Sequence, residues 1–284
     1  MIRIALIFVL VSLTGMTKAQ SSLKKGSYAS YGPMTLEDNS VFLEEAFNQG
    51  MGVIQYISTF WMKRNGEIDF SFTQEIPITD KKHQFSYTLN YLQRGSNPMS
   101  THGFGDLSLG YRYQVMDEND WIMVIPRLSI ILPTGSSVLG FGNGAVGVQG
   151  NLAMTKRLSR KVVTHYNLGA TEFIKSKYYG SAADGEKVIY KKNLFQKNAG
   201  VSFVWHPAPG ANLLLEYVAL FEQEFQQNGS IEKRMQLIFN PAVRFSMRLG
   251  NVQVVPGIGL PLVYDRAWES GGMLVYLSVE TNYQ

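Results

Sequence analysis

The chain has 284 residues, a formal net charge of +4 and no cysteine. The weak net charge gives no indication of nucleic-acid binding, and the lack of cysteine excludes disulfide bonds and cysteine-ligated metal sites. Charged residues make up only 17% of the chain, whereas 45% are hydrophobic and 12% are aromatic. Soluble domains usually contain about 25% charged residues. This composition suits a barrel whose outer surface meets lipid.

The first residues have the pattern of a secretory signal peptide. Arg3 precedes an apolar run from Ile4 to Leu13, and Thr17-Lys18-Ala19 places small residues where a signal peptidase reads them. The run is too short to cross the ~30 Å hydrocarbon core of a bilayer. We therefore expect residues 1–19 to be removed and Gln20 to begin the exported chain.

Beyond residue 50 the hydrophobicity alternates with a period of two. Between residues 104 and 115, outward apolar side chains such as Tyr111 alternate with polar ones such as Arg112, and residues 144–156 and 235–247 repeat the pattern. Successive side chains of a strand point to opposite faces. Alternating segments of about ten residues, separated by turns, are typical of outer-membrane barrels.

These segments predict an all-β fold, a transmembrane antiparallel up-and-down β-barrel of about twelve strands in residues 51–284, with ten to fourteen as the open range. The expected strands are residues 52–62, 67–78, 84–93, 104–115, 121–132, 144–156, 161–172, 193–205, 213–222, 232–247, 251–262 and 272–283. Short and long connections alternate after the first hairpin, which Asn65-Gly66 closes tightly. We expect the short turns to face the periplasm and the longer loops, including residues 174–191, to face outside.

Residues 20–50 differ from the rest of the chain. Asp38-Asn39-Ser40 is a capping sequence for a short helix over residues 41–48, which Gly50 would stop. The segment would either plug the barrel or form a periplasmic tail, and the sequence leaves both alternatives open.

Aromatic residues near the expected strand ends would form girdles at the two membrane interfaces, although core packing in a soluble sandwich is the alternative. These residues are Tyr111, Tyr113, Trp121, Trp205, Tyr217, Phe221 and Tyr276. The last expected strand alternates apolar residues and ends near an aromatic, which resembles the terminal signal read by the barrel-assembly machinery, although Tyr283-Gln284 replaces the usual terminal Phe. We therefore expect localisation in the outer membrane of a Gram-negative cell. The expected partners are outer-membrane lipid and, during biogenesis, the barrel-assembly machinery and periplasmic chaperones, with no nucleic acid.

Several stretches resemble one known family. They are Val41–Gln49 with Gly52–Ile57, the glycine-rich strand Gly103–Tyr113, and Pro126–Gly135 with its Leu-Pro-Thr-Gly ending, followed by Gly142–Gly144. The chain resembles the outer-membrane proteins associated with the phenol-degradation meta pathway, often called transporters. The resemblance implies an outer-membrane barrel that passes small molecules, with hydrophobic or aromatic ones suggested. It supplies no catalytic residues.

The chain shows no sign of catalytic or metal chemistry. None of its four histidines shares an element with a second ligand at metal-binding spacing, so we expect no metal and no cofactor. Outer-membrane phospholipases need a serine soon after a histidine, but His165 is followed by Tyr166-Asn167-Leu168-Gly169. We expect a protein that is not an enzyme.

The polar strand faces supply the candidate residues. The candidate lumen-lining residues are Asp106, Arg112, Arg127, Gln149, Asn151, His165, Asn240, Arg244 and Arg248. The arginines among them would either constrict a pore that favours anions or pair with acids, since buried charges are usually paired. Two functions follow: a channel or facilitator for small molecules, or a structural or binding barrel with a closed lumen. Twelve strands lie between the eight that enclose only side chains and the sixteen that leave an aqueous pore.

Overall fold

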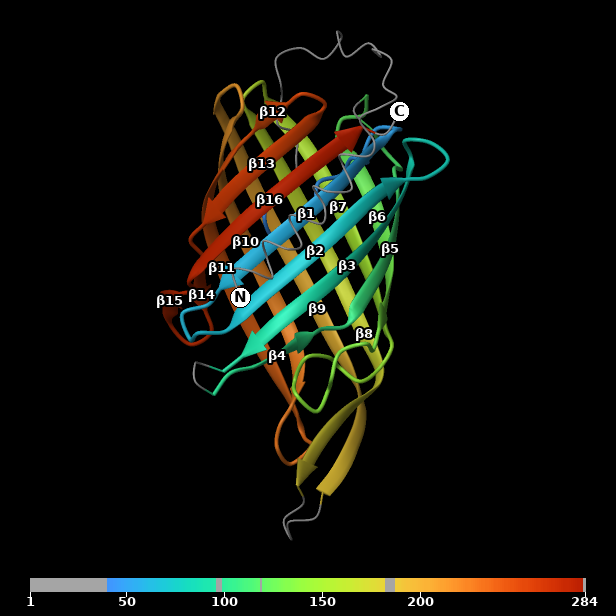
Figure 1. The fold of residues 1–284 in the computed structure, drawn as a ribbon, viewed down its shortest axis with the longest axis vertical. Helices are drawn as coiled ribbons and strands as arrows, with labels where there is room; N and C mark the ends of the chain where they lie inside the picture. The colour runs from blue at the N-terminus through green and yellow to red at the C-terminus, as the bar shows by residue number, and fades with distance from the viewer. Residues whose placement is uncertain (1–39, 96–98, 118, 182–186, 283–284) are drawn as a thin grey trace.

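The computed structural model describes residues 40–95, 99–117, 119–181 and 187–282. The expected signal peptide and residues 20–39 lie outside the described residues. Every regular element in the described part is a β-strand (Figure 1). In the described ranges, no helix has the length and apolarity needed to cross a membrane.

The strands form one antiparallel sheet that closes on itself. They are β1 (Val53–Met62), β2 (Ile68–Pro77), β3 (His83–Arg94), β4 (Thr101–Phe104), β5 (Leu107–Tyr113), β6 (Met123–Leu132), β7 (Gly147–Ser159), β8 (Val162–Ser181), β9 (Lys187–Ala208), β10 (Ala211–Phe225), β11 (Ile231–Phe245), β12 (Met247–Leu249), β13 (Val252–Gly259), β14 (Leu262–Tyr264), β15 (Trp268–Ser270) and β16 (Met273–Asn282). Four wall strands are interrupted, so β4 and β5, β11 and β12, β13 and β14, and β15 and β16 each form one wall strand. The wall therefore has twelve strands, which confirms the predicted number.

The first and last wall strands close the barrel. β1 pairs with β16 over its whole length, from Val53 opposite Asn282 to Met62 opposite Met273. Because the circle is complete, the sheet has no unpaired edge that would need water or another chain.

The two faces of the wall differ as the alternation predicts. Leu128, Leu168 and Leu215 point outward and are 59%, 54% and 50% exposed. Their neighbours in the alternation point inward, and Arg112 and Glu216 are almost completely buried. The outer face is thus apolar and the inner face largely polar, the reverse of a soluble protein.

Two expectations were wrong. Tyr276 is not in an interfacial girdle, because it points inward, is 1% exposed and packs against Val255 and Leu274. Residues 174–181 and 187–191 do not form the expected loop, because β8 and β9 continue through them as a hairpin beyond the barrel, with Ser176 opposite Lys192. A stack of Tyr178 on Tyr190 across this hairpin supports the extension, with ring centroids 6.4 Å apart.

The barrel has two different ends. The turns between β2 and β3, between β7 and β8, and between β9 and β10 around Gly210 lie at one end, here called the short-turn end, at the top of Figure 1. The loop between β10 and β11 and the protruding β8–β9 hairpin lie at the opposite end, the long-loop end, at the bottom of the figure. The first hairpin is tight although it lies at the long-loop end, and Gly66 in its turn has a φ of 86°.

A charge on the outer face tests the membrane assignment. Leu168→Arg should reduce folding into lipid vesicles by ~2–4 kcal/mol, because a cation near the bilayer midplane loses its hydration. Heat-modifiable migration on gels measures the folded fraction, and Leu168→Met is the matched control. Equal folding of the two variants, or a folded monomer in plain buffer, would contradict a lipid-facing Leu168.

The orientation is tested by single cysteines, which are clean probes because the chain has none. Asn228→Cys at the long-loop end should react with an impermeant thiol reagent on intact cells. Asn119→Cys at the short-turn end should react only after the outer membrane is opened. The opposite labelling pattern would show that the long-loop end faces the periplasm.

Candidate functional site in the barrel lumen

Residues 40–50, here called the lumenal segment, cross the inside of the barrel. Ser40 contacts β9 through Ser202, whereas Gln49 contacts β3 through Gln84 and β1 through Gln55. Between these points the segment also bonds to residues on or beside β5, β7, β8 and β10. A chain that touches seven strands of a closed ring must lie within the ring.

The lumenal segment is not the helix that the sequence predicts. Its residues are extended with bends, and the wall rather than the segment itself supplies the hydrogen-bond acceptors. The N–H of Glu44 donates to Asn167 Oδ1 at 2.9 Å, and the N–H of Ala46 donates to Thr155 Oγ1 at 2.8 Å. The N–H groups of Val41 and Phe42 both donate to one oxygen of Glu216, at 2.8 and 2.9 Å. These wall acceptors replace the internal bonds of a helix.

Apolar contacts hold the first half of the segment. Phe42 packs edge-on against Trp61, with ring centroids 5.4 Å apart. Leu43, which is 4% exposed, packs against inward-facing Val218 and Ile238. Gly200 makes room for it, since a Cβ there would collide with the Leu43 methyl groups. One side of the lumen is therefore apolar and is filled by the segment.

A charged cluster holds the second half of the segment. Arg112 lies between Glu45 and Glu75, with nitrogen–oxygen distances of 3.5 and 3.4 Å, and all three side chains are buried. The guanidinium also donates to the carbonyl oxygens of Glu45 and Phe47 and to Asn48 Oδ1. Because a buried charge without a partner is very unfavourable, this cluster fixes the segment to β5.

A second ion pair lies beside this cluster, on the neighbouring strand β6, where Arg127 is directly opposite Arg112. Arg127 Nη2 is 2.6 Å from Glu44 Oε1, and the two side chains are 21% and 22% exposed. The Arg127 Nη2 also donates to Gln149 Oε1 at 3.1 Å. This pair is more accessible than the Arg112 cluster.

The loop between β6 and β7, residues 133–146, folds inward at the long-loop end. Asp106 accepts the N–H groups of Gly135 and Asn143 at 3.0 and 2.9 Å, and Phe141 of this loop is 4% exposed. A Cβ at Gly142 would collide with the Asp106 carboxylate. The two glycine-rich stretches that carry the family resemblance thus meet in space, and their glycines permit the close approach.

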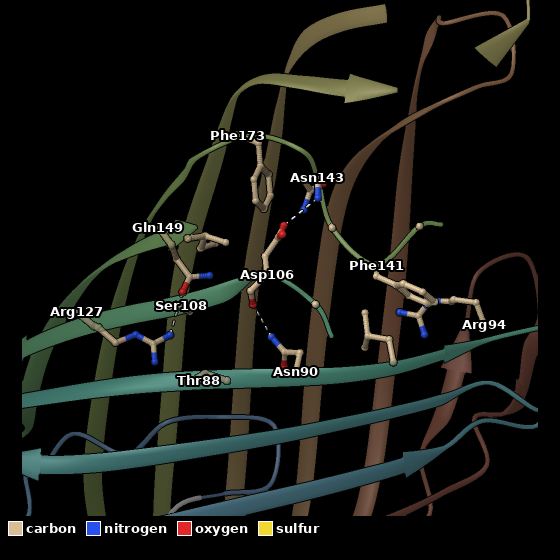
Figure 2. Close-up of a pocket in the computed structure, with 15 residues that line it drawn as sticks. Thr88, Asn90, Arg94, Asp106, Ser108, Arg127, Phe141, Asn143, Gln149 and Phe173 are labelled. Carbon is tan, nitrogen blue, oxygen red and sulfur yellow. Dashed lines mark hydrogen bonds between the residues drawn. The ribbon is translucent and has the colours of Figure 1, made fainter. Parts of the chain in front are cut away.

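The inward loop and the wall line an open cavity of about 470 Å³, here called the loop pocket (Figure 2). Figure 2 shows Asp106 reaching the loop at Asn143, with Arg127 at one side of the pocket and Arg94 at the other. The lining residues used below are Ser108, Arg127, Ile131, Phe141, Gln149 and Phe173. Arg94 is paired with Asp69, whose other oxygen lies 2.7 Å from Lys63 Nζ.

Three further predicted residues, His165, Asn240 and Arg244, have structural partners in the wall. His165, which is 2% exposed, has its Nδ1 2.8 Å from Thr155 Oγ1, the acceptor of the Ala46 N–H. Asn240 donates to Glu216 Oε2 at 2.6 Å. Buried Arg244 lies over the Tyr276 ring, 5.6 Å from its centroid.

The structure does not bring all nine predicted residues together. Asn151 is buried on β7, but Arg248 is exposed on the three-residue strand β12 at the short-turn end. The sequence missed Glu44 and Glu45, the acids that reach the lumenal arginines. Both lie in the segment expected to be a helix, outside the alternating strands from which the lumen-lining residues were predicted. Among the described residues, no three His, Asp or Glu side chains are grouped so that they could hold a metal ion.

Comparison with known proteins gives the fold. No protein-family model and no curated protein matches the chain. The COG4313 outer membrane channel from Pseudomonas putida F1 superposes with a TM-score of 0.62 at 14% identity, over 85% of this chain and 99% of that chain. The NanC porin gives a TM-score of 0.47 at 7% identity, over 81% and 99% of the two chains. The TodX monoaromatic hydrocarbon channel gives 0.39 at 10% identity, over 89% and 93%. The first likeness shows that this chain has the fold of an outer-membrane β-barrel, and the other two are too distant to add to it.

The Arg112 cluster generates a stability prediction. Arg112→Met should lower the free energy of unfolding by about 3–5 kcal/mol, because Glu45 and Glu75 remain buried without their cation. Arg234→Met, which breaks the exposed pair with Asp265, is the matched control and should cost under about 1 kcal/mol. Urea unfolding in micelles, followed by tryptophan fluorescence, measures both. Equal losses would mean that the cluster does not fix the segment.

Proposed function

We propose that this protein is an outer-membrane channel for small molecules whose lumen is opened and closed by the lumenal segment. The observation that carries the proposal is that a closed barrel with an apolar outer face holds a segment of its own chain across its lumen through non-covalent contacts. An apolar exterior suits lipid, and a polar interior suits solutes in transit.

The route through the barrel has two parts. Solutes enter the loop pocket from the long-loop end and then meet the lumenal segment, which runs from Trp61, near the long-loop end, to Gln84 at the short-turn end. Passage requires part of the segment to leave its bonds with the wall. A state that is populated at 0.1–10% or so is sufficient for brief openings.

The resemblance to the phenol meta-pathway family supports small, hydrophobic or aromatic solutes as the transported class. Phe141 and Phe173 in the wall of the loop pocket agree with that class.

A non-conducting barrel is the second candidate, and the lumenal segment itself favours it. Its N–H groups are bonded in turn to side chains of four wall strands, and Leu43 and Ala46 are buried. Such a segment could serve only to complete the core.

A reversible covalent lock distinguishes the two candidates. The hydroxyl groups of Ser40 and Ser202 hydrogen-bond to each other, so the variant Ser40→Cys/Ser202→Cys should form a disulfide bond. The disulfide bond fixes the first half of the lumenal segment to β9. The second half of the segment continues covalently into β1. In planar bilayers the oxidised protein should be silent, and reduction should restore openings.

Each single-cysteine variant is the control for effects of the thiols. Equal conductance before and after reduction would show that the segment is not the barrier. Silence of the wild type and of both redox states of the double variant would favour the non-conducting barrel.

A further inference from the structure

The two ion pairs of the lumenal segment differ in a way that points to a ligand. In the Arg112 cluster, the side chains of Arg112 and Glu45 are 1% exposed and that of Glu75 is 6% exposed, and the guanidinium is surrounded by protein acceptors. Arg127 and Glu44 are each more than a fifth exposed, and Arg127 lines the loop pocket. The Arg127–Glu44 contact is therefore the accessible one.

The Arg127–Glu44 pair also leaves polar atoms without partners. Arg127 Nε and Glu44 Oε2 are both buried and have no hydrogen-bond partner in the described part of the chain. Only one nitrogen and one oxygen meet, at 2.6 Å, although a guanidinium and a carboxylate can form two parallel bonds. Glu44 is thus a poor match for the full donor set of Arg127.

The rest of the loop pocket supplies the other contacts that a small organic anion needs. Gln149 and Ser108 offer polar groups beside Arg127, while Ile131 and the largely buried rings of Phe141 and Phe173 form the apolar part of the lining. The cavity of about 470 Å³ is of the size that takes small organic ligands.

We propose that the loop pocket binds a small organic monocarboxylate with an apolar body, whose carboxylate replaces Glu44 on Arg127. The apolar body lies against Phe141 and Phe173, and the displaced Glu44 carboxylate moves into the pocket solvent. The inference rests on the proposed channel function, because it names the class of solute that the same route carries. Occupation of the site frees one of the contacts that hold the first half of the lumenal segment.

The test uses benzoate as the probe and isothermal titration calorimetry of the purified full-length barrel in detergent. Arg127→Gln should weaken benzoate binding about 10–100-fold, because a charge-assisted hydrogen bond is lost. Glu44→Gln should strengthen it by up to about fivefold, because the competing carboxylate of a partly exposed pair is removed. The opposite signs of these two changes are the signature of displacement.

Three controls make the result specific. Arg234→Gln removes an arginine from a surface pair outside the pocket and should leave affinity unchanged. The double variant Glu44→Gln/Arg127→Gln removes both charges of the pair. It therefore measures the loss of benzoate binding when Arg127 is replaced without leaving Glu44 unpaired. Benzyl alcohol, which has the same ring but no carboxylate, should bind at least tenfold or so more weakly than benzoate.

Weaker binding in Glu44→Gln, unchanged binding in Arg127→Gln, or equal affinity for benzyl alcohol would overturn the inference. The outcome is separable from that of the channel proposal. Conductance without benzoate binding would refute the site alone, whereas benzoate binding to a barrel that never conducts would refute the channel alone.

Discussion

Backbone hydrogen bonding is the constraint on which the rest of this structure depends. A strand surrounded by hydrocarbon cannot give its N–H and C=O groups to water, so each must pair with a neighbouring strand. The pairing of β1 with β16 completes the ring and removes the last free edge. In a closed ring, every second side chain of a strand points into the lumen and the others point outward. A ring of twelve strands is wider than the eight-stranded barrels whose side chains fill the interior. The lumenal segment occupies part of the additional space.

The same constraint decides the conformation of the lumenal segment. Its N–H groups are buried and need acceptors, and the inward polar side chains of the wall are placed to accept them. The carbonyl oxygens of the segment also have donors, since the Asn167 side chain donates to the carbonyl oxygen of Glu44 and the Gln114 side chain donates to that of Ala46. A helix would satisfy its own backbone but would deprive the buried oxygens Glu216 Oε1, Asn167 Oδ1 and Thr155 Oγ1 of the N–H donors that the segment gives them. The extended form satisfies the segment and the wall together.

Local sequence information was sufficient for the wall and insufficient for what lies inside it. Alternation is a property of neighbouring residues, so the strands and the inward direction of Arg112 and Asn240 could be predicted. The inward position of Tyr276 could not, because one side of the lumen is apolar and only tertiary packing shows which strands line that side. The expected helix over residues 41–48 was wrong for a related reason. Its capping residue and its period are local signals, whereas the acceptors Glu216, Asn167 and Thr155 are on strands more than a hundred residues away.

The arrangement of charges determines which part of the lumenal segment can move. Separating Arg112 from Glu45 would leave charges with almost no access to solvent, which costs several kcal/mol or so. Separating Arg127 from Glu44 costs far less, because both groups retain some access to water and a solute anion can replace the carboxylate. Residues 45–50 are therefore held by the Arg112 cluster and by their covalent continuation into β1. Residues 40–44 depend on hydrogen bonds to Ser202, Glu216 and Asn167, on the packing of Phe42 and Leu43, and on the one exchangeable ion pair. Movement of this half alone would widen the lumen beside β9 and β10 while the buried cluster on β5 stays intact.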